Sequence, residues 1–333
     1  MALLSPLAAR AQLDLTGDQA LEDLRKRNPA GDNDTQILKN WLKAEFDKIT
    51  GPNPETGRFR GVVRTVRNDG ATSDAFREAL MTRLGEFARD QLASADLPRK
   101  AAAELVRTLS DANDPRVIPG YLNGLNHSEQ EIRYLSAKGM QDIRNQIGDD
   151  APAFIAGLQQ RGVAEENGVV VERIYLALAF PNPTDELVGA LNAILAARVE
   201  RYRQGAVLVD NAEPTLLNYL GGVRLTDAQA RGIVRQLAVF LRLDVADFGA
   251  AAERGQFLPG QRDSIERRIC IIEEFLRQSV RPGQGLGGDI CRKLGEIPVL
   301  PAALQFELNN WIGTPQTPGV LNDNPWNVPT GAP

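Results

Sequence analysis

The chain has 333 residues, 43% of them hydrophobic and 24% charged, as is typical of a soluble folded protein. Its net charge of −5 argues against a general nucleic-acid binder or a polybasic membrane-surface protein, and no stretch approaches the ~18 apolar residues of a transmembrane helix. One histidine and two cysteines leave no Cys-x-x-Cys, His-Glu-x-x-His or haem-attachment motif, so we expect neither a metal nor a cofactor.

The first residues indicate export. Ala9-Arg10-Ala11 follows the small-x-small pattern that precedes signal-peptidase cleavage, with Gln12 as the new N-terminus. The apolar stretch before it is short and lacks a basic region, which fits residues 1–11 being the end of a signal peptide whose start lies upstream of Met1. We therefore expect a periplasmic or secreted protein; the alternative is a cytoplasmic protein with a short apolar N-terminus.

Apolar residues recur at helical spacing along most of the chain. The first clear helix runs from Asn33 to Ile49 and ends at Gly51-Pro52-Asn53-Pro54. Another opens at Ser128, where Glu131 three residues later predicts a capping box. Further helices are expected at 59–66, 73–94, 98–111, 114–125, 151–161, 167–180, 184–204, 213–221, 226–241, 244–253, 262–280, 288–295 and 301–312. No segment alternates as a strand does, so the pattern predicts an all-α protein.

Residues 114–147 resemble one repeat of the HEAT/armadillo family. The first helix reads D-P-R-V-I-P-G-Y-L-N-G-L and opens with Asp114-Pro115, and the second reads E-I-R-Y-L-S-A-K-G-M-Q-D-I. Ile132-Arg133 falls on the family's Val-Arg position, and Ser136 and Gly139 are small where the family prefers Ala. Small residues at these positions let neighbouring helices approach closely.

The resemblance departs from the family at Asn126, which stands where the family usually carries an Asp. It implies a curved α-α superhelix, a solenoid of antiparallel helix pairs whose faces bind proteins. We accordingly divide the chain into an N-terminal helical segment at 12–95 and a HEAT-like array at 96–313. Residues 314–333 contain five prolines and little periodicity, so we predict an irregular tail that is extended or disordered, with Trp326 as a candidate anchor.

One basic cluster is a candidate binding site. On a helix over residues 59–66 and its flanks, Arg60, Arg64 and Arg67 share one face. Guanidinium groups in such a row bind phosphate or carboxylate groups well. The alternative is that these arginines form the solvated face of an amphipathic helix.

Other residues of types that often react or bind ligands are explained by structural roles. Cys270 and Cys291 lie on two predicted helices, which a disulfide would join in an exported protein; in the cytosol both would be small buried side chains. His127 lies in a turn, and we assign it no catalytic role. Residues 283–288 match G-x-G-x-x-G, but a helix precedes them in place of a strand, so we predict a loop. Acidic pairs read as helix caps or solvated faces at Asp149-Asp150, Glu165-Glu166 and Glu273-Glu274.

These observations favour a non-catalytic scaffold of the cell envelope or periplasm that binds another protein and no nucleic acid. Two alternatives stay open. An exported all-helical chain of this length also fits an α/α toroid that cleaves polysaccharides with two carboxylates, although the chain has only three Trp and five Tyr for sugar stacking. The other alternative is a structural component of a larger assembly, with the Pro-rich tail as its docking segment.

Overall fold

The computed structural model describes residues 19–27, 29, 31–51, 54–148, 151–279, 287–296, 299–323 and 325–330. Within these ranges the protein is all-helical, as predicted, and contains no strand. Its α-helices are α1 (Gln19–Lys26), α2 (Gly31–Thr50), α3 (Arg58–Asn68), α4 (Asp74–Leu92), α5 (Arg99–Ala112), α6 (Ile118–Leu125), α7 (Gln130–Ile143), α8 (Ala151–Ala164), α9 (Gly168–Ala177), α10 (Asp185–Arg203), α11 (Ala212–Gly221), α12 (Asp227–Arg254), α13 (Gln261–Ser279), α14 (Ile290–Leu294) and α15 (Pro301–Ile312). Short 3₁₀ turns are η1 (Pro115–Val117), η2 (Arg144–Gln146) and η4 (Val320–Asn322).

Two sequence-based expectations lie outside the described residues. They concern the export segment at residues 1–11 and the pair Asp149-Asp150. Within the described ranges, each helix is either too short or too polar to cross a bilayer.

The helices form two compact units, residues 1–146 and 147–333. The boundary therefore follows η2, whereas the sequence placed one at residues 95/96. Helices on both sides of residue 95 pack together, because α3 lies against α5 and α4 lies against α6. The predicted N-terminal segment is thus continuous with the first part of the predicted array.

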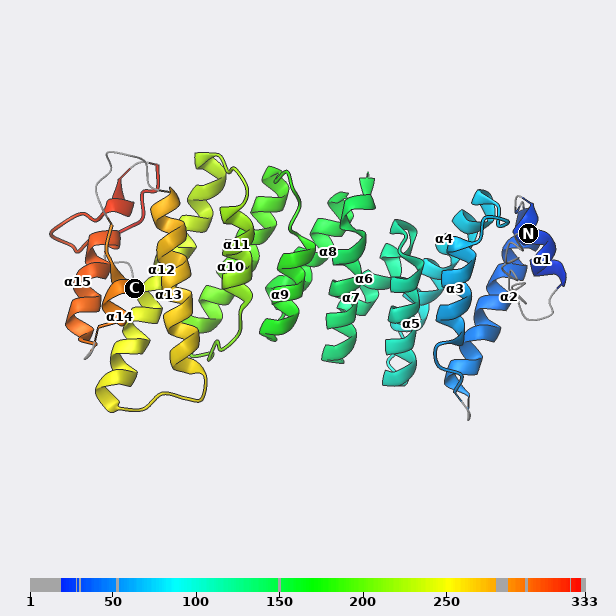
Figure 1. The fold of residues 1–333 in the computed structure, drawn as a ribbon, viewed down its shortest axis with the longest axis horizontal. Helices are drawn as coiled ribbons and strands as arrows, with labels where there is room; N and C mark the ends of the chain where they lie inside the picture. Colours follow the sequence, from blue (N-terminus) through cyan, green and yellow to red (C-terminus); the bar gives the residue numbers. More distant parts are fainter. Residues whose placement is uncertain are drawn as a thin grey trace, which may run out of the picture. The chain divides into compact units, whose positions relative to one another are not determined.

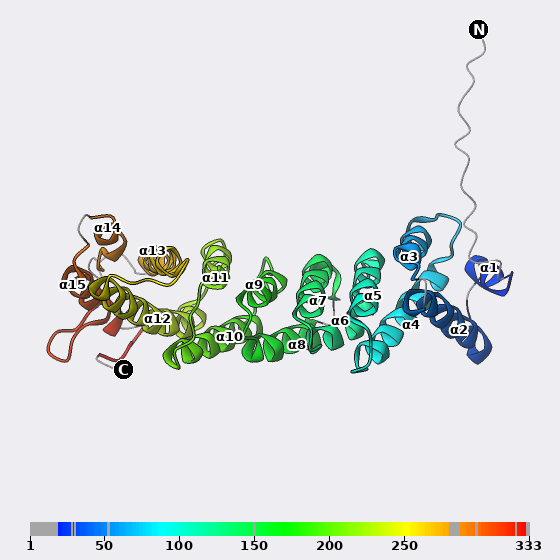
Figure 2. The same ribbon diagram turned by 90° about the horizontal axis from the view of Figure 1, so that it is seen from below.

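Within unit 1 the helices lie in two layers. One layer contains α2, α4 and α6, and the other contains α3, α5 and α7, as Figures 1 and 2 show. Within each layer, each helix contacts the helix two places along the chain, and the second layer covers the apolar stripes of the first. The helices α2 to α7 therefore alternate between the two layers along the chain.

Small residues set the closest approach in unit 1. A Cβ built on Gly139 of α7 would overlap the ring of Tyr121 on α6, which is fully buried. Ser136 of α7 is likewise buried, next to Gly124 of α6. The interpretation of Ser136 and Gly139 as small packing positions therefore agrees with the observed contact between α6 and α7.

Unit 2 repeats the two-layer arrangement. Helices α8, α10 and α12 form one layer and α9, α11 and α13 the other, and α14 and α15 follow at the end of the chain (Figure 2). Helix α15 packs on α12, and α14 lies between α13 and α15.

The Pro-rich tail is packed, in contrast to the expectation of an extended or disordered segment. Trp326 is only 2% exposed, and Leu321 and Val328 are buried as well. Arg231 and Arg235 of α12 donate to the main-chain oxygens of Pro325 (2.6 Å) and Trp326 (3.0 Å). Three large apolar side chains in an otherwise polar segment account for this docking.

Two helix boundaries also differ from expectation. The predicted helices 226–241 and 244–253 are the single helix α12, because Asp244 does not cap a new helix but lies buried inside this one. The predicted capping box at Ser128 is absent: Glu129 is the N-cap of α7 without a side-chain bond, and Glu131 pairs with Arg99 and Arg107.

The contact between Gly139 and Tyr121 predicts a specific loss of stability. We expect Gly139→Ala to lower the free energy of unfolding of unit 1 by about 1–3 kcal/mol, because the new methyl group must displace a buried ring. Gly61, which is exposed on α3 with open space around it, provides the matched control. Gly61→Ala should raise stability by about 0.5–1 kcal/mol. Urea titration checks both changes, and equal effects of the two variants would contradict the packing account.

Candidate anion-binding surface

The predicted arginine face lies on α3, in the second layer of unit 1. Phe59, Val63 and Val66 are buried and fix the rotation of the helix. This rotation brings the guanidinium groups to the side of α3 that faces α5. The sequence pattern placed the arginines on one helix face but gave no sign of a partner on another helix.

That partner is Asp111, in the last turn of α5. Arg60 Nε lies 2.7 Å from Asp111 Oδ2, and Arg64 Nη2 lies 2.8 Å from Oδ1. Arg67 donates from Nη1 to the main-chain oxygen of Asp111 at 2.9 Å, and so binds one of the carbonyls left unpaired at the end of α5. The three predicted residues thus converge on Asp111 of the chain itself, two on its carboxylate and Arg67 on its main-chain carbonyl. Binding of an external anion stays a prediction.

Buried acids anchor the start of α3. Glu104 of α5, only 4% exposed, accepts a hydrogen bond of 2.6 Å from Gly57 N, where a positive φ of 84° turns the chain into the helix. Glu45 of α2 is buried and pairs with Arg58 at 3.4 Å. These acids are far from α3 in sequence, so no local pattern reveals them.

A second pair of arginines binds a carboxylate on the same layer. Arg99 and Arg107 of α5 contact Glu131 of α7 at 2.7 and 3.0 Å. The hydrogen bond from Arg99, followed by the charges of both arginines, holds the pKa of Glu131 below its ordinary value. The layer α3–α5–α7 therefore presents two carboxylates, each between two arginines.

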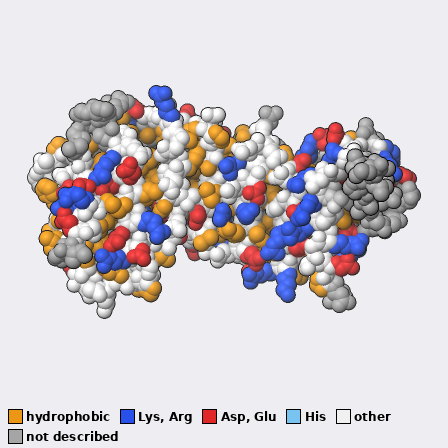
Figure 3. Space-filling view, in the orientation of Figure 1, with side chains coloured by type: hydrophobic (Ala, Val, Ile, Leu, Met, Phe, Trp, Pro, Cys, Tyr) orange, Lys and Arg blue, Asp and Glu red, His pale blue; other side chains and the backbone are white. Residues whose placement is uncertain are grey.

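The charge of α3 and α5 differs from that of the whole chain. Together the two helices contain seven Lys and Arg and two acids, a net charge of +5 in a protein of −5. Figure 3 shows basic side chains gathered over these helices on the outer surface of their layer. Arg64 is 53% exposed and Arg60 is 32% exposed, so both remain accessible to solvent.

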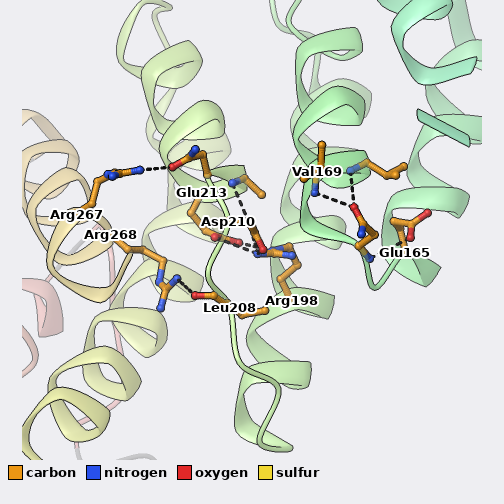
Figure 4. A network of polar contacts seen from close by, with 12 residues as sticks. Glu165, Val169, Arg198, Leu208, Asp210, Glu213, Arg267 and Arg268 are labelled. Atoms are coloured by element: carbon orange, nitrogen blue, oxygen red, sulfur yellow. Dashed lines mark hydrogen bonds and ion pairs between the residues drawn. The ribbon is translucent and has the colours of Figure 1, made fainter. Parts of the chain in front are cut away.

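Two arginines of unit 2, Arg198 and Arg268, are buried in internal ion pairs. Figure 4 shows Arg198 of α10 between Asp210 and Glu213. Its Nη2 lies 2.8 Å from Asp210 Oδ1 and 3.2 Å from Glu213 Oε2. Arg198 and Glu213 are at most 1% exposed, so the contacts link α10 to the start of α11 inside the core.

A second buried pair lies on α12 and α13. Arg268 donates from Nε to Asp244 at 2.9 Å and from Nη1 to the main-chain oxygen of Leu208 at 3.0 Å (Figure 4). Tyr202 donates to the same Asp244 at 2.9 Å. Through Arg268, the pair therefore attaches the α10–α11 connection, which contains Leu208, to α13 in the second layer of unit 2.

The remaining candidates occupy structural positions. Cys270 of α13 and Cys291 of α14 are joined by a disulfide. Beside it, Glu273 is 1% exposed and accepts from Ile290 N (2.8 Å), Cys291 N (2.8 Å) and Trp311 Nε1 (3.0 Å). Glu273 thus binds the start of α14, whereas its neighbour Glu274 hydrogen-bonds Gln278 on the surface of α13.

His127 and the described end of the glycine motif make structural contacts. His127 Nδ1 accepts from Glu129 N at 3.0 Å, which closes the turn before α7, and burial is the main cause that lowers its pKa. Of residues 283–288, only Gly287 and Gly288 are described, and they pack against Trp311 and Glu307. The rest of this motif lies outside the described residues.

Among the residues that the structure describes, hollows are found in unit 2. One of about 230 Å³ lies beside Tyr202, Asp247 and Arg268, and one of about 270 Å³ lies between Phe275 and Trp326. Both are below the roughly 300 Å³ at which small-molecule pockets begin. The exposed arginine surface of unit 1 is therefore the better-formed candidate. Comparison of the chain with protein-family models, curated proteins and solved structures found no match.

The buried pair of unit 2 makes a prediction about stability. Arg268→Met leaves Asp244 charged and buried without its cation, so we expect a loss of about 3–5 kcal/mol. The double variant Asp244→Leu/Arg268→Met should recover most of that loss. Arg292→Met removes an exposed pair with Glu296 on α14 and should cost less than about 1 kcal/mol. Guanidinium unfolding of unit 2 checks this order, and an Arg268→Met variant as stable as Arg292→Met would contradict it.

The disulfide makes a second prediction. Its cysteines are 21 residues apart, and a loop of that length predicts a loss of about 3 kcal/mol in the double variant Cys270→Ser/Cys291→Ser. We further expect no free thiol in protein taken from its native host, denatured without reductant. Two reactive thiols in that assay would contradict the disulfide.

Proposed function

We propose that the chain is a non-catalytic scaffold of the cell envelope or periplasm, a HEAT-like α-α superhelix that binds another protein. The observation that carries this proposal is the packing of α2–α7 in unit 1 and of α8–α13 in unit 2, where each helix contacts the next helix of its own layer, two places along the chain. Repeat arrays built this way expose a row of parallel helices on each side, and each repeat adds a few contacts to an extended interface.

The roles of the buried charges support the same proposal. Asp244, Glu213 and Glu273 each bind donors of the protein itself and connect neighbouring helices. The charged residues that remain accessible lie on the outer surface of the layers, as Arg64 does. Such surfaces suit recognition of a second protein through an extended area.

The disulfide supports export as part of the proposal. Disulfides persist in oxidising compartments and are rare in the cytosol, where thiols are kept reduced. The small five-residue helix α14 is attached to α13 through Cys291 and Glu273, which suits a protein that works outside the cytosol.

Cross-linking in the native organism tests the scaffold function. The full chain with an affinity tag is treated with a cleavable cross-linker in cells, purified under denaturing conditions and analysed by mass spectrometry, with an unrelated tagged protein as control. We expect one host protein in near-stoichiometric amount, cross-linked to successive helices of a single layer, because an extended interface spans several helix pairs.

The opposite outcome is equally specific. If no protein is enriched across several salt concentrations, and the pure chain hydrolyses a polysaccharide in a manner abolished by replacing one acidic residue, the scaffold proposal fails. The α/α-toroid enzyme would then describe the chain.

A further inference from the structure

The charge on α3 and α5 is confined to a small part of the chain. These two helices have a net charge of +5, whereas the whole protein has a net charge of −5, so the rest of the chain has a net charge of −10. With 11 and 14 residues, the two helices are only about 16–21 Å long. A long polyanion such as nucleic acid would extend beyond this surface and meet the acidic remainder, which disfavours it.

The geometry of the arginines favours carboxylates. Asp111 lies between Arg60 and Arg64, and Glu131 lies between Arg99 and Arg107, at distances of 2.7 to 3.0 Å. At both places the two planar guanidinium groups have the spacing that binds a carboxylate, so they suit a carboxylate ligand.

Donors remain for an incoming ligand. A guanidinium group has five N–H donors. Among the described residues, the contacts of Arg60 with Asp111 use Nε, and those of Arg64 use Nε and Nη2. Asp111 is 15% exposed, so it lies below the two arginines, whose outer edges face solvent.

We propose that the outer surface of α3 and α5 docks an acidic segment of a partner protein, whose carboxylates bind Arg60, Arg64 and Arg107. The proposal rests on the scaffold function and names the chemistry of its partner. In the free protein Asp111 neutralises part of the site, and in the complex the partner's carboxylates share the same guanidinium groups. Exposed ion pairs of this kind contribute little, so an external carboxylate competes with Asp111 at modest cost.

Binding of a labelled peptide of alternating glutamate and serine to the full chain tests this surface. Fluorescence anisotropy is measured at low and at physiological salt, with the glutamine version of the peptide as control. We expect the glutamate peptide alone to bind, more weakly at the higher salt. Arg60→Gln/Arg64→Gln should weaken binding by roughly tenfold or more, since two charge-assisted contacts are lost.

Matched variants distinguish binding at this surface from a general effect of the net charge of the protein. Asp111→Asn should tighten binding by roughly three- to tenfold, because it releases Arg60 and Arg64. This gain is a result that misfolding does not produce. Asp142→Asn makes the same charge change beside Lys138 on α7 and should have little effect. Arg83→Gln/Arg89→Gln removes two cations from α4 in the other layer and should also bind normally.

Several results would overturn the proposal. The first is that the wild-type chain does not bind the glutamate peptide. The second is that it binds polyphosphate or anionic phospholipid vesicles more tightly than the peptide. The third is that the α4 and α3 variants weaken peptide binding equally. If the cross-linked host protein is retained by Arg60→Gln/Arg64→Gln, this surface is refuted while the scaffold function stands. If no host protein is captured and the pure chain hydrolyses a polysaccharide, the scaffold function fails independently of peptide binding.

Discussion

Every helix in the two units buries apolar surface against a sequence neighbour or against the helix two places along the chain, and this constraint shapes the rest of the structure. It requires small residues where helices approach most closely, as at Gly139 against Tyr121. Because of the same constraint, charged residues lie either between helices or on the outer surface of a layer. Unit 2 uses the first location at Arg198 and Arg268, and unit 1 uses the second at Arg60 and Arg64.

The same type of ion pair therefore serves different ends in the two units. The Arg268–Asp244 pair is fully buried, and its desolvation is offset by close geometry and by hydrogen bonds from Tyr202 to Asp244 and from Arg268 to the main-chain oxygen of Leu208. It contributes connectivity between helices more than net stability. The pairs around Asp111 stay in contact with water, where screening keeps them weak and exchangeable. At a docking surface, a carboxylate of the partner must be able to replace the internal carboxylate, and weak pairs allow this exchange.

The sequence predicts the helical class and most helix positions, because 3.6-residue periodicity and Gly/Pro punctuation are local signals. It also identifies the arginine row and the cysteine pair. It does not reveal Asp111, Glu104 or Glu273 as partners, since these contacts join residues 17 to 51 positions apart. One error has a local cause. Glu131 matches half of a capping box, because an acidic residue near a helix start shows the same local pattern whether it caps the helix or pairs with a distant arginine. The contacts that hold the tail are not predicted, because Arg231 and Arg235 of α12 bind residues 91 to 94 positions away along the chain.

Recognition of a partner's carboxylates by the outer surface of α3 and α5 would change the surroundings of its guanidinium groups. Arginine side-chain NMR detects this change by following the Nε–H signals of the full chain while the glutamate–serine peptide is added. We expect shifts confined to Arg60, Arg64 and Arg107, with the signals of Arg83 and Arg89 of α4 unchanged. Signals that stay unmoved at Arg60 and Arg64, or that shift equally over both layers, would contradict it.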